Sequence, residues 1–409
     1  MKILLSIALT IYGLFTVVGS AFAQTWTLTS APVTNLWQSI ASSADGSKLV
    51  ACCNDFEVYP AHYVIYSSTD SGATWTSRIT LTNWGWFSVA SSADGNKLVA
   101  VSWKFGIYVS TNSGVDWMQT SAPTNILWTS VASSADGSRL VAAAGTALNY
   151  VGPIYISTNS GATWIPTSAP IASWVSLAAS ADGNKLAAAA CIGPIYTSAD
   201  GGITWAQTSA PNTNWVSITS SADGNKLTAA QYFSGADDSF IYTSTDTGAS
   251  WTAHYFPPDI AHGWQGIASS ADGNKLVAVT QGPIFTSTDS GTTWVSNNAP
   301  AQIYWCVASS ADGGKLVAGS VGDLGVAEGG GIYTAQTTPS PQLNLSLSGR
   351  ADLTASWIVP STDFALQQSA DLSNWTDITD APALNLTNLQ EEVVLSPTNS
   401  SGFYRLKTP

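Results

Sequence analysis

The tetrapeptide Ser-Ala-Asp-Gly recurs along most of this chain and constrains its fold more than any other feature. Its aspartates occupy seven positions, Asp45, Asp94, Asp136, Asp182, Asp223, Asp272 and Asp312. Successive copies are therefore 49, 42, 46, 41, 49 and 40 residues apart. Repeats of about this length are typical of arrays in which each unit is one supersecondary element packed on its neighbours. The chain thus contains seven units, each of the length of a propeller blade.

Each unit reads as four short strands separated by turn signals. In the unit at 174–211, the alternating run WVSLAAS ends at an Asp-Gly turn, and KLAAAA, PIYTS and TWAQTS follow it. Asp-Gly sequences tolerate the positive φ angles of tight hairpins. Four antiparallel strands per unit, repeated seven times, predict an all-β fold, a seven-bladed β-propeller over residues 24–334.

A second motif, Ser-x-Asp-x-Gly-x-Thr-Trp, occurs in six of the seven units. Its copies are Ser68–Trp75, Ser110–Trp117, Ser157–Trp164, Ser198–Trp205, Ser244–Trp251 and Ser287–Trp294. The seventh unit has three expected strands, at 304–310, 315–318 and 331–334, and lacks a fourth. The segment QTWTLTSAP at 24–32 matches the fourth-strand text of the other units. We therefore predict that the strand of Trp26 pairs with that of Ile332 and Tyr333, because ring closure removes two exposed sheet edges.

These motifs resemble the Asp-box, or BNR-type, repeat of sialidases, sortilin-like receptors, xyloglucan hydrolases and photosystem II assembly-factor-like propellers. The resemblance covers residues 24 to about 334 and implies that the box is a structural hairpin. Its Ser and Asp side chains would bond nearby backbone groups, its Gly would supply an unusual φ angle, and its Trp would pack between blades. Asn112 and Asn159 replace the aspartate in two boxes, which suits a turn better than a metal site. We expect no metal and no cofactor.

The first 23 residues have the composition of a cleavable secretory signal. Lys2 precedes an apolar run that ends at Ala21-Phe22-Ala23, so we expect a secreted mature chain that begins at Gln24. No other segment has 18 uninterrupted apolar residues, which predicts no membrane span. The net charge of −13 argues against nucleic acid as a partner. We expect a monomer, and buried small thiols at Cys52, Cys53, Cys191 and Cys306.

The two faces of such a propeller differ in how much their sequences vary. One face holds the turns between strands 1 and 2 and between strands 3 and 4, which contain only the repeated motifs and predict a structural role. Seven basic residues accompany these turns, and we expect each near its own Asp: Lys48, Lys97, Arg139, Lys185, Lys226, Lys275 and Lys315. The other face holds the strand 2–3 loops and the links between blades.

The strand 2–3 loops alternate between long and short. Counted from each SADG Asp to the first residue of the next box position, the spacing is 23, 16, 21, 16, 21, 15 and 23 residues. The long loops therefore belong to blades 1, 3, 5 and 7. Because seven is odd, the long loops of blades 7 and 1 become neighbours on closure, and we expect them to form one wall of a groove.

Acidic and aromatic residues gather on this loop face, and loops on a rigid scaffold commonly bind ligands. The candidate binding residues are Asp55, Glu57, His62, Tyr63, Trp103, Tyr150, Asp237, Asp238, Asp323 and Glu328. The sequence leaves open the alternative that these side chains only decorate solvated loops.

Signatures of catalysis are sparse. A sialidase needs clustered arginines, and only Arg78 and Arg139 lie in the propeller. A glycoside hydrolase of xyloglucanase type remains an alternative, because the acids in the loops of blades 1 and 7 would supply two carboxylates about 5 to 10 Å apart. No C-x-x-C, H-E-x-x-H or G-x-S-x-G motif is present, and we assign no catalytic residue. The leading hypothesis is a secreted non-enzymatic binding or assembly protein that holds a protein, peptide or glycan on its loop face.

The C-terminal part changes character after a linker at 335–342. Residues 343–409 contain about seven short alternating runs, a pattern typical of a small β-sandwich. The ending SADLSNWTDI … GFYRLKTP resembles fibronectin type III-like C-terminal modules of secreted bacterial proteins. The resemblance implies either a module that presents the propeller at the cell surface or one that only caps the linker.

Overall fold

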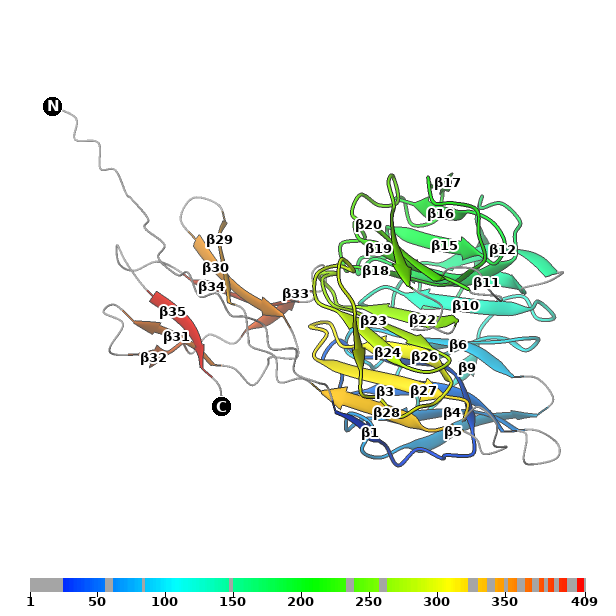
Figure 1. Cartoon of the computed structure of the whole chain (residues 1–409), viewed down its shortest axis with the longest axis horizontal. Helices are drawn as coiled ribbons and strands as arrows, with labels where there is room; N and C mark the ends of the chain where they lie inside the picture. The colour runs from blue at the N-terminus through cyan, green and yellow to red at the C-terminus, as the bar shows by residue number, and fades with distance from the viewer. Residues whose placement is uncertain are drawn as a thin grey trace.

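Seven four-stranded antiparallel sheets make up the repeat region in the computed structural model (Figure 1). In that region the structure describes residues 25–55, 62–82, 85–146, 150–232, 239–256, 263–322 and 330–336. Further on it describes residues 343–348, 352–358, 365–369, 375–378, 382–385, 390–395 and 403–407.

Each of the first six sheets, numbered here as blades 1 to 6, uses four consecutive strands. Blade 1 comprises β2 (Leu36–Ser42), β3 (Leu49–Asp55), β4 (His62–Ser68) and β5 (Thr76–Thr82), and blade 2 comprises β6 (Trp86–Ser91), β7 (Leu98–Ser102), β8 (Gly106–Ser110) and β9 (Met118–Gln119). Blade 3 comprises β10 (Trp128–Ser133), β11 (Leu140–Thr146), β12 (Tyr150–Ser157) and β13 (Ile165–Pro166), and blade 4 comprises β14 (Trp174–Ala179), β15 (Leu186–Ala190), β16 (Ile195–Ser198) and β17 (Ala206–Gln207). Blade 5 comprises β18 (Trp215–Ser220), β19 (Leu227–Gln231), β20 (Ser239–Ser244) and β21 (Thr252–Phe256), and blade 6 comprises β22 (Trp264–Ser269), β23 (Leu276–Thr280), β24 (Ile284–Ser287) and β25 (Val295–Asn297).

Blade 7 is completed by the start of the chain, as predicted. Its strands are β26 (Tyr304–Ser309), β27 (Lys315–Ser320), β28 (Ile332–Gln336) and β1 (Trp26–Leu28), and Figure 1 shows β1 beside β28. Trp26 lies opposite Ala335 and Leu28 lies opposite Tyr333. Trp26 is buried, whereas Thr27 and Leu28 are exposed.

The innermost strands contact one another in a closed circle, in the order β2, β6, β10, β14, β18, β22, β26 and again β2. Each has a fully buried aromatic side chain at its first or second residue, namely Trp37, Trp86, Trp128, Trp174, Trp215, Trp264 or Tyr304. In every blade this aromatic side chain makes a T-shaped contact with an aromatic side chain of the third strand. In blade 2, for example, the ring centroids of Trp86 and Tyr108 are 5.2 Å apart. Large aromatic side chains between neighbouring sheets provide much of the apolar burial that holds the blades together.

All four cysteines are buried free thiols, as the sequence analysis expected. Cys306 occupies a position where five other blades have serine, and the facing residue is Gly319. A Cβ atom on Gly319 would lie 2.7 Å from the Cys306 sulfur, so the larger side chain is matched by the smallest possible neighbour.

In the part of the chain that the structure describes, no helix is long and apolar enough to cross a membrane.

The C-terminal residues form two further antiparallel sheets. One contains β29 (Asn344–Ser348), β30 (Asp352–Ile358), β34 (Gln390–Leu395) and β33 (Ala383–Asn385), and the other contains β32 (Thr376–Asp377), β31 (Ala365–Ser369) and β35 (Phe403–Lys407). Buried Trp357, Leu366 and Val393 form their shared apolar cluster. Two sheets with a common core fit the predicted β-sandwich, and the fibronectin type III-like assignment stays a prediction.

Candidate functional site

The face of the SADG turns is closed at its centre by a ring of seven alanines. Each turn's alanine N–H donates to the alanine carbonyl of the next blade at 2.7 or 2.8 Å, through Ala44, Ala93, Ala135, Ala181, Ala222, Ala271 and Ala311. The last of these bonds runs from Ala311 in blade 7 to Ala44 in blade 1, so the circle is complete. A small cavity of about 160 Å³, lined by serines and alanines, lies at this end of the axis.

The basic residues on this face fasten each turn to the next. We expected each one near its own Asp, but the Lys48 ammonium instead donates to the carbonyl oxygen of Asp94 in blade 2 at 3.0 Å and to Asn96 Oδ1 at 2.6 Å. The Lys48 stem lies across Gly95, where an added Cβ would come within 2.8 Å of Lys48 Cβ and Cδ. The same stem-over-glycine contact recurs around the ring and closes with Lys315 over Gly46. These side chains are therefore part of the joints between blades.

The Asp boxes are hairpins held by their own side chains. In blade 4, Thr204 donates from its backbone N–H to Asp200 Oδ1 at 2.9 Å and from its hydroxyl to Oδ2 at 2.6 Å. The hydrogen bond from the Thr204 hydroxyl is the main reason that the pKa of Asp200 falls to about 2. In blade 3, Asn159 keeps the same backbone contact, with Thr163 N–H donating to its Oδ1 at 2.9 Å. The box thus needs a turn-forming oxygen, which Asn supplies as well as Asp.

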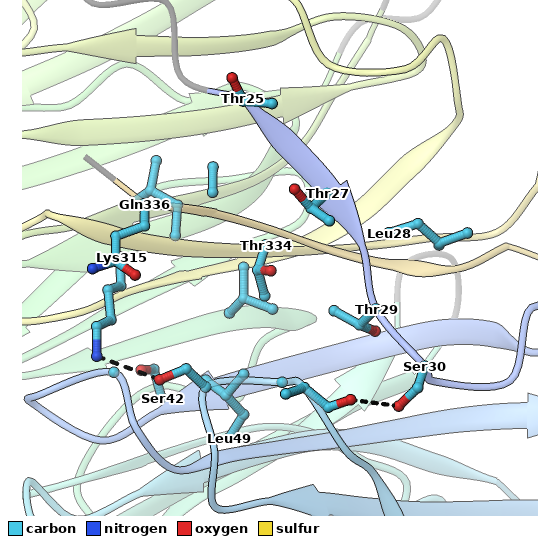
Figure 2. Close-up of a pocket in the computed structure, with 17 residues that line it drawn as sticks. Thr25, Thr27, Leu28, Thr29, Ser30, Ser42, Leu49, Lys315, Thr334 and Gln336 are labelled. Carbon is cyan, nitrogen blue, oxygen red and sulfur yellow. Dashed lines mark hydrogen bonds between the residues drawn. The ribbon is translucent and has the colours of Figure 1, made fainter. Parts of the chain in front are cut away.

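A pocket of about 520 Å³ opens at the seam between blades 7 and 1 (Figure 2). Thr27 of β1, Thr334 of β28 and Lys315 line it, together with the Asp box of blade 1. The corresponding space between blades 3 and 4 is only about 10 Å³. Blade 7 lacks an Asp box, so we attribute the pocket to the missing hairpin. Its polar groups bond to one another, since Lys315 Nζ donates to Ser71 Oγ at 3.3 Å.

A recess on the opposite, loop-bearing face lies along the axis and has a volume of about 530 Å³. We call it the axial funnel. The residue that follows each blade's buried aromatic lines it, namely Gln38, Phe87, Thr129, Val175, Val216, Gln265 and Trp305. In all seven blades the pairing between the first and second strands shifts register at this residue. A β-bulge leaves one residue unpaired and redirects its side chain, which explains why seven consecutive blades present a side chain to the axis.

The lining of the axial funnel is uneven around the ring. Blades 6, 7, 1 and 2 contribute Gln265, Trp305, Gln38 and Phe87, which alternate between amide and aromatic groups. Trp103 from the strand 2–3 loop of blade 2 extends this side, with its ring 5.6 Å from that of Phe87. Blades 3 to 5 contribute the smaller Thr, Val and Val, and the Thr129 hydroxyl already donates to the Trp174 carbonyl at 2.9 Å. One half of the funnel is therefore amide and aromatic, and the other half combines two valines with the hydroxyl residues Thr129, Ser130, Ser176 and Ser217.

Two lining side chains of the axial funnel are unusually placed. Trp305 is 41% exposed, whereas the aromatic residue before it, Tyr304, is fully buried. Gln265 is 8% exposed, and its Nε2 is buried without a hydrogen-bond partner among the described residues. Burying an amide without a partner costs on the order of 1 to 3 kcal/mol. Among its described lining residues the funnel has no charged side chain.

The structure places only some of the predicted binding residues at the axial funnel. Trp103 lines it, whereas His62 and Tyr63 at the start of β4 do not. Tyr150 at the start of β12 is 58% exposed and also lies outside the lining. Asp55 ends β3, but its side chain lies outside the described residues, as do Glu57, Asp237, Asp238, Asp323 and Glu328. The predicted groove wall between blades 7 and 1 therefore remains a prediction.

Sequence reasoning missed the funnel residues, although a signal for them was present. Five units contain Trp-x-Ser at this point, and blades 6 and 7 contain Trp-Gln-Gly and Tyr-Trp-Cys; the middle residue takes the values Gln, Phe, Thr, Val, Val, Gln and Trp. The predicted binding residues were chosen from loops, and this position lies inside a strand. Variation at one strand position of an otherwise regular repeat would have identified it.

No protein-family model and no curated protein matches the chain. Solved structures do match it. YCF48 from Cyanidioschyzon merolae is 14% identical with a TM-score of 0.56, and the match covers 76% of this chain and 98% of that one. A structure described as YCF48 bound to D1 peptide is 17% identical with a TM-score of 0.56, covering 82% of this chain and 100% of that one. The chain therefore has a fold similar to that of YCF48.

Proposed function

We propose that this chain is a secreted, non-enzymatic binding or assembly protein that holds a protein or peptide partner on its loop-bearing face. The observation that carries the proposal is the axial funnel, where exposed Trp305 and the poorly paired amide of Gln265 converge on one recess. Binding sites commonly combine an apolar and aromatic lining with a few placed polar groups. The described lining supplies contact surface and hydrogen-bonding groups rather than acids or bases for proton transfer.

The similarity in fold to YCF48 supports a peptide as the partner. One YCF48 structure is described as bound to a D1 peptide, so a propeller of this kind can hold a peptide. The opposite face of the present chain is occupied by joints between blades, including the alanine ring and the Lys48 contact with blade 2. Residues there already serve the fold, which leaves the loop-bearing face as the proposed binding face.

The loop acids are proposed to add attraction around the recess. Asp55 ends β3 and His62 begins β4, so the segment that contains Glu57 connects two strands on the loop-bearing face. Asp323 and Glu328 fall in the corresponding connection of blade 7. Acids in these loops would attract a partner with a basic surface, and salt would screen that attraction.

A peptide array, a glycan array and a polysaccharide hydrolysis screen on the purified protein test this proposal together. Peptide binding that weakens when the four acids of blades 1 and 7 become Asn or Gln is the expected result. Ile192→Ala, an exposed change in the strand 2–3 connection of blade 4 on the same face, is the matched control and should leave binding unchanged. Hydrolysis of a glycan that is lost in the acid variants would replace the proposal with a glycoside hydrolase. Impaired binding in Lys97→Ala, with melting temperature unchanged, would place the site on the other face.

A further inference from the structure

We propose that the axial funnel accepts an uncharged, apolar loop of a protein partner, and that Gln265 bonds a main-chain carbonyl of that loop. This inference rests on the proposed function and adds the chemistry of the partner. It follows from the charge of the lining, the unpaired amide and the unequal halves of the ring.

The charge of the lining excludes chain ends as the inserted group. A peptide's C-terminal carboxylate needs a cation or several hydrogen-bond donors when it leaves water, and its N-terminal ammonium needs acceptors of matching charge. The described lining of the axial funnel carries no charged side chain at all. An internal segment with uncharged side chains is the part of a polypeptide that enters such a recess at the lowest desolvation cost.

The amide of Gln265 indicates what the inserted segment must supply. Its Nε2 is buried and has no partner in the described part of the chain, while the side chain forms part of the funnel wall. Rotation about the last side-chain bond of Gln is soft, so the NH₂ group can turn toward the recess. A main-chain carbonyl is the acceptor that an uncharged loop presents at every residue. Gln38 provides a second amide two blades away on the same half of the ring.

The two halves of the ring suit the two sides of such a loop. Aromatic Phe87, Trp103 and Trp305 offer flat apolar faces between the amides, and Val175 and Val216 offer an aliphatic surface opposite. Ser130, Ser176 and Ser217 also lie on that side, and each hydroxyl oxygen already accepts a backbone N–H of the next blade. A glycan stacks on aromatic faces and presents hydroxyls in all directions, so on this side its hydroxyls would meet only valines and hydroxyl groups that are already engaged. The mixed lining therefore favours a peptide loop with apolar side chains over a sugar.

Selection of displayed, disulfide-closed random peptide loops on the full-length protein tests the inference. We expect enrichment of aromatic and aliphatic residues at the loop tip, which enters the funnel, and depletion of charged residues at that tip. Trp305→Ala should weaken binding of a selected loop by about tenfold or more, because a partly exposed aromatic contact is removed. Ile192→Ala, an exposed change in the strand 2–3 connection of blade 4, is the matched control and should leave the affinity unchanged.

Gln265→Leu provides the sharper readout. Removing a buried amide without a partner should leave the melting temperature unchanged or raise it, while the affinity for the loop falls about tenfold through the lost hydrogen bond. A residue with only a structural role would give lower stability and unchanged affinity, which would overturn the inference. Selected loops with a charged tip and an affinity indifferent to Trp305→Ala would also overturn it, while leaving the proposed function in place. If no peptide binds, both this inference and the proposed function are wrong.

Discussion

Replacing Trp26 with Ala tests whether the first strand closes the ring. Trp26 is 6% exposed and packs with Tyr304, Leu316 and Tyr333 of blade 7. Its indole Nε1 is buried and has no hydrogen-bond partner among the residues that the structure describes, so within them the substitution removes apolar contact and no hydrogen bond. Loss of a buried tryptophan costs about 3 to 5 kcal/mol when the site cannot collapse. The expected loss is a large part of the free energy of unfolding of a typical domain, which is about 5 to 15 kcal/mol.

Urea unfolding of wild type and variant, followed by circular dichroism, measures the effect. Leu28→Ala is the matched control, because Leu28 belongs to the same three-residue strand and is 48% exposed. We expect a loss of about 3 to 5 kcal/mol for Trp26→Ala and about 0.5 kcal/mol or less for Leu28→Ala. Equal and small effects of the two substitutions would refute closure by β1.

Three further predictions concern the repeat itself. Gly95→Ala should lower the free energy of unfolding by about 2 kcal/mol or more, because φ is +66° and the new Cβ meets Lys48 at 2.8 Å. A change below about 0.5 kcal/mol in urea would contradict the stem-over-glycine joint. The pKa of Asp200 is lowered to about 2 from a usual value near 3.8, so the stability it contributes is present above about pH 4 and is lost as pH falls toward 2. The free energy of unfolding of Asp200→Asn should therefore fall less between about pH 4 and pH 2 than that of the wild type. The same pH dependence in both proteins would contradict this. Gly266→Ser introduces the serine that five other blades have at this position. In blade 2 the equivalent Ser88 lies opposite a valine, as Gly266 does, and its hydroxyl oxygen accepts the Val131 N–H of the next blade. We therefore expect the substitution to raise the free energy of unfolding by about 0.5 to 1 kcal/mol. A lower melting temperature would contradict that interpretation.

The regular part of this molecule was predictable because each unit repeats the same local chemistry. The Asp-Gly turns, the alternating first strand and the incomplete seventh unit were enough to predict seven blades and the pairing of Trp26 with the last blade. The register of β1 was less predictable, since a shift of two residues leaves every side chain on the same face. The reach of Lys48 into the next blade was missed because it depends on the angle between blades, which no single repeat encodes.

The candidate site was only partly predictable from the sequence. Trp103 was identified from its place in a loop, and it lines the axial funnel. Gln265 and Trp305 were missed, because a β-bulge rather than a loop turns them toward the axis. Bulges depend on pairing between strands and leave no mark in one strand's own sequence. The loop acids lie outside the described residues, and their role stays a prediction.

Hydrogen–deuterium exchange of the full-length protein, with and without a selected peptide loop, tests the central claim most directly. If the partner occupies the axial funnel, protection should appear at the starts of the innermost strands, at residues 36–39, 86–88, 264–266 and 304–306, which carry the amide and aromatic lining. The alanine ring and the Asp boxes on the opposite face should exchange at the same rate in both samples. Protection confined to the SADG turns or to the seam pocket, with the strand starts unchanged, would contradict the assignment of the binding face.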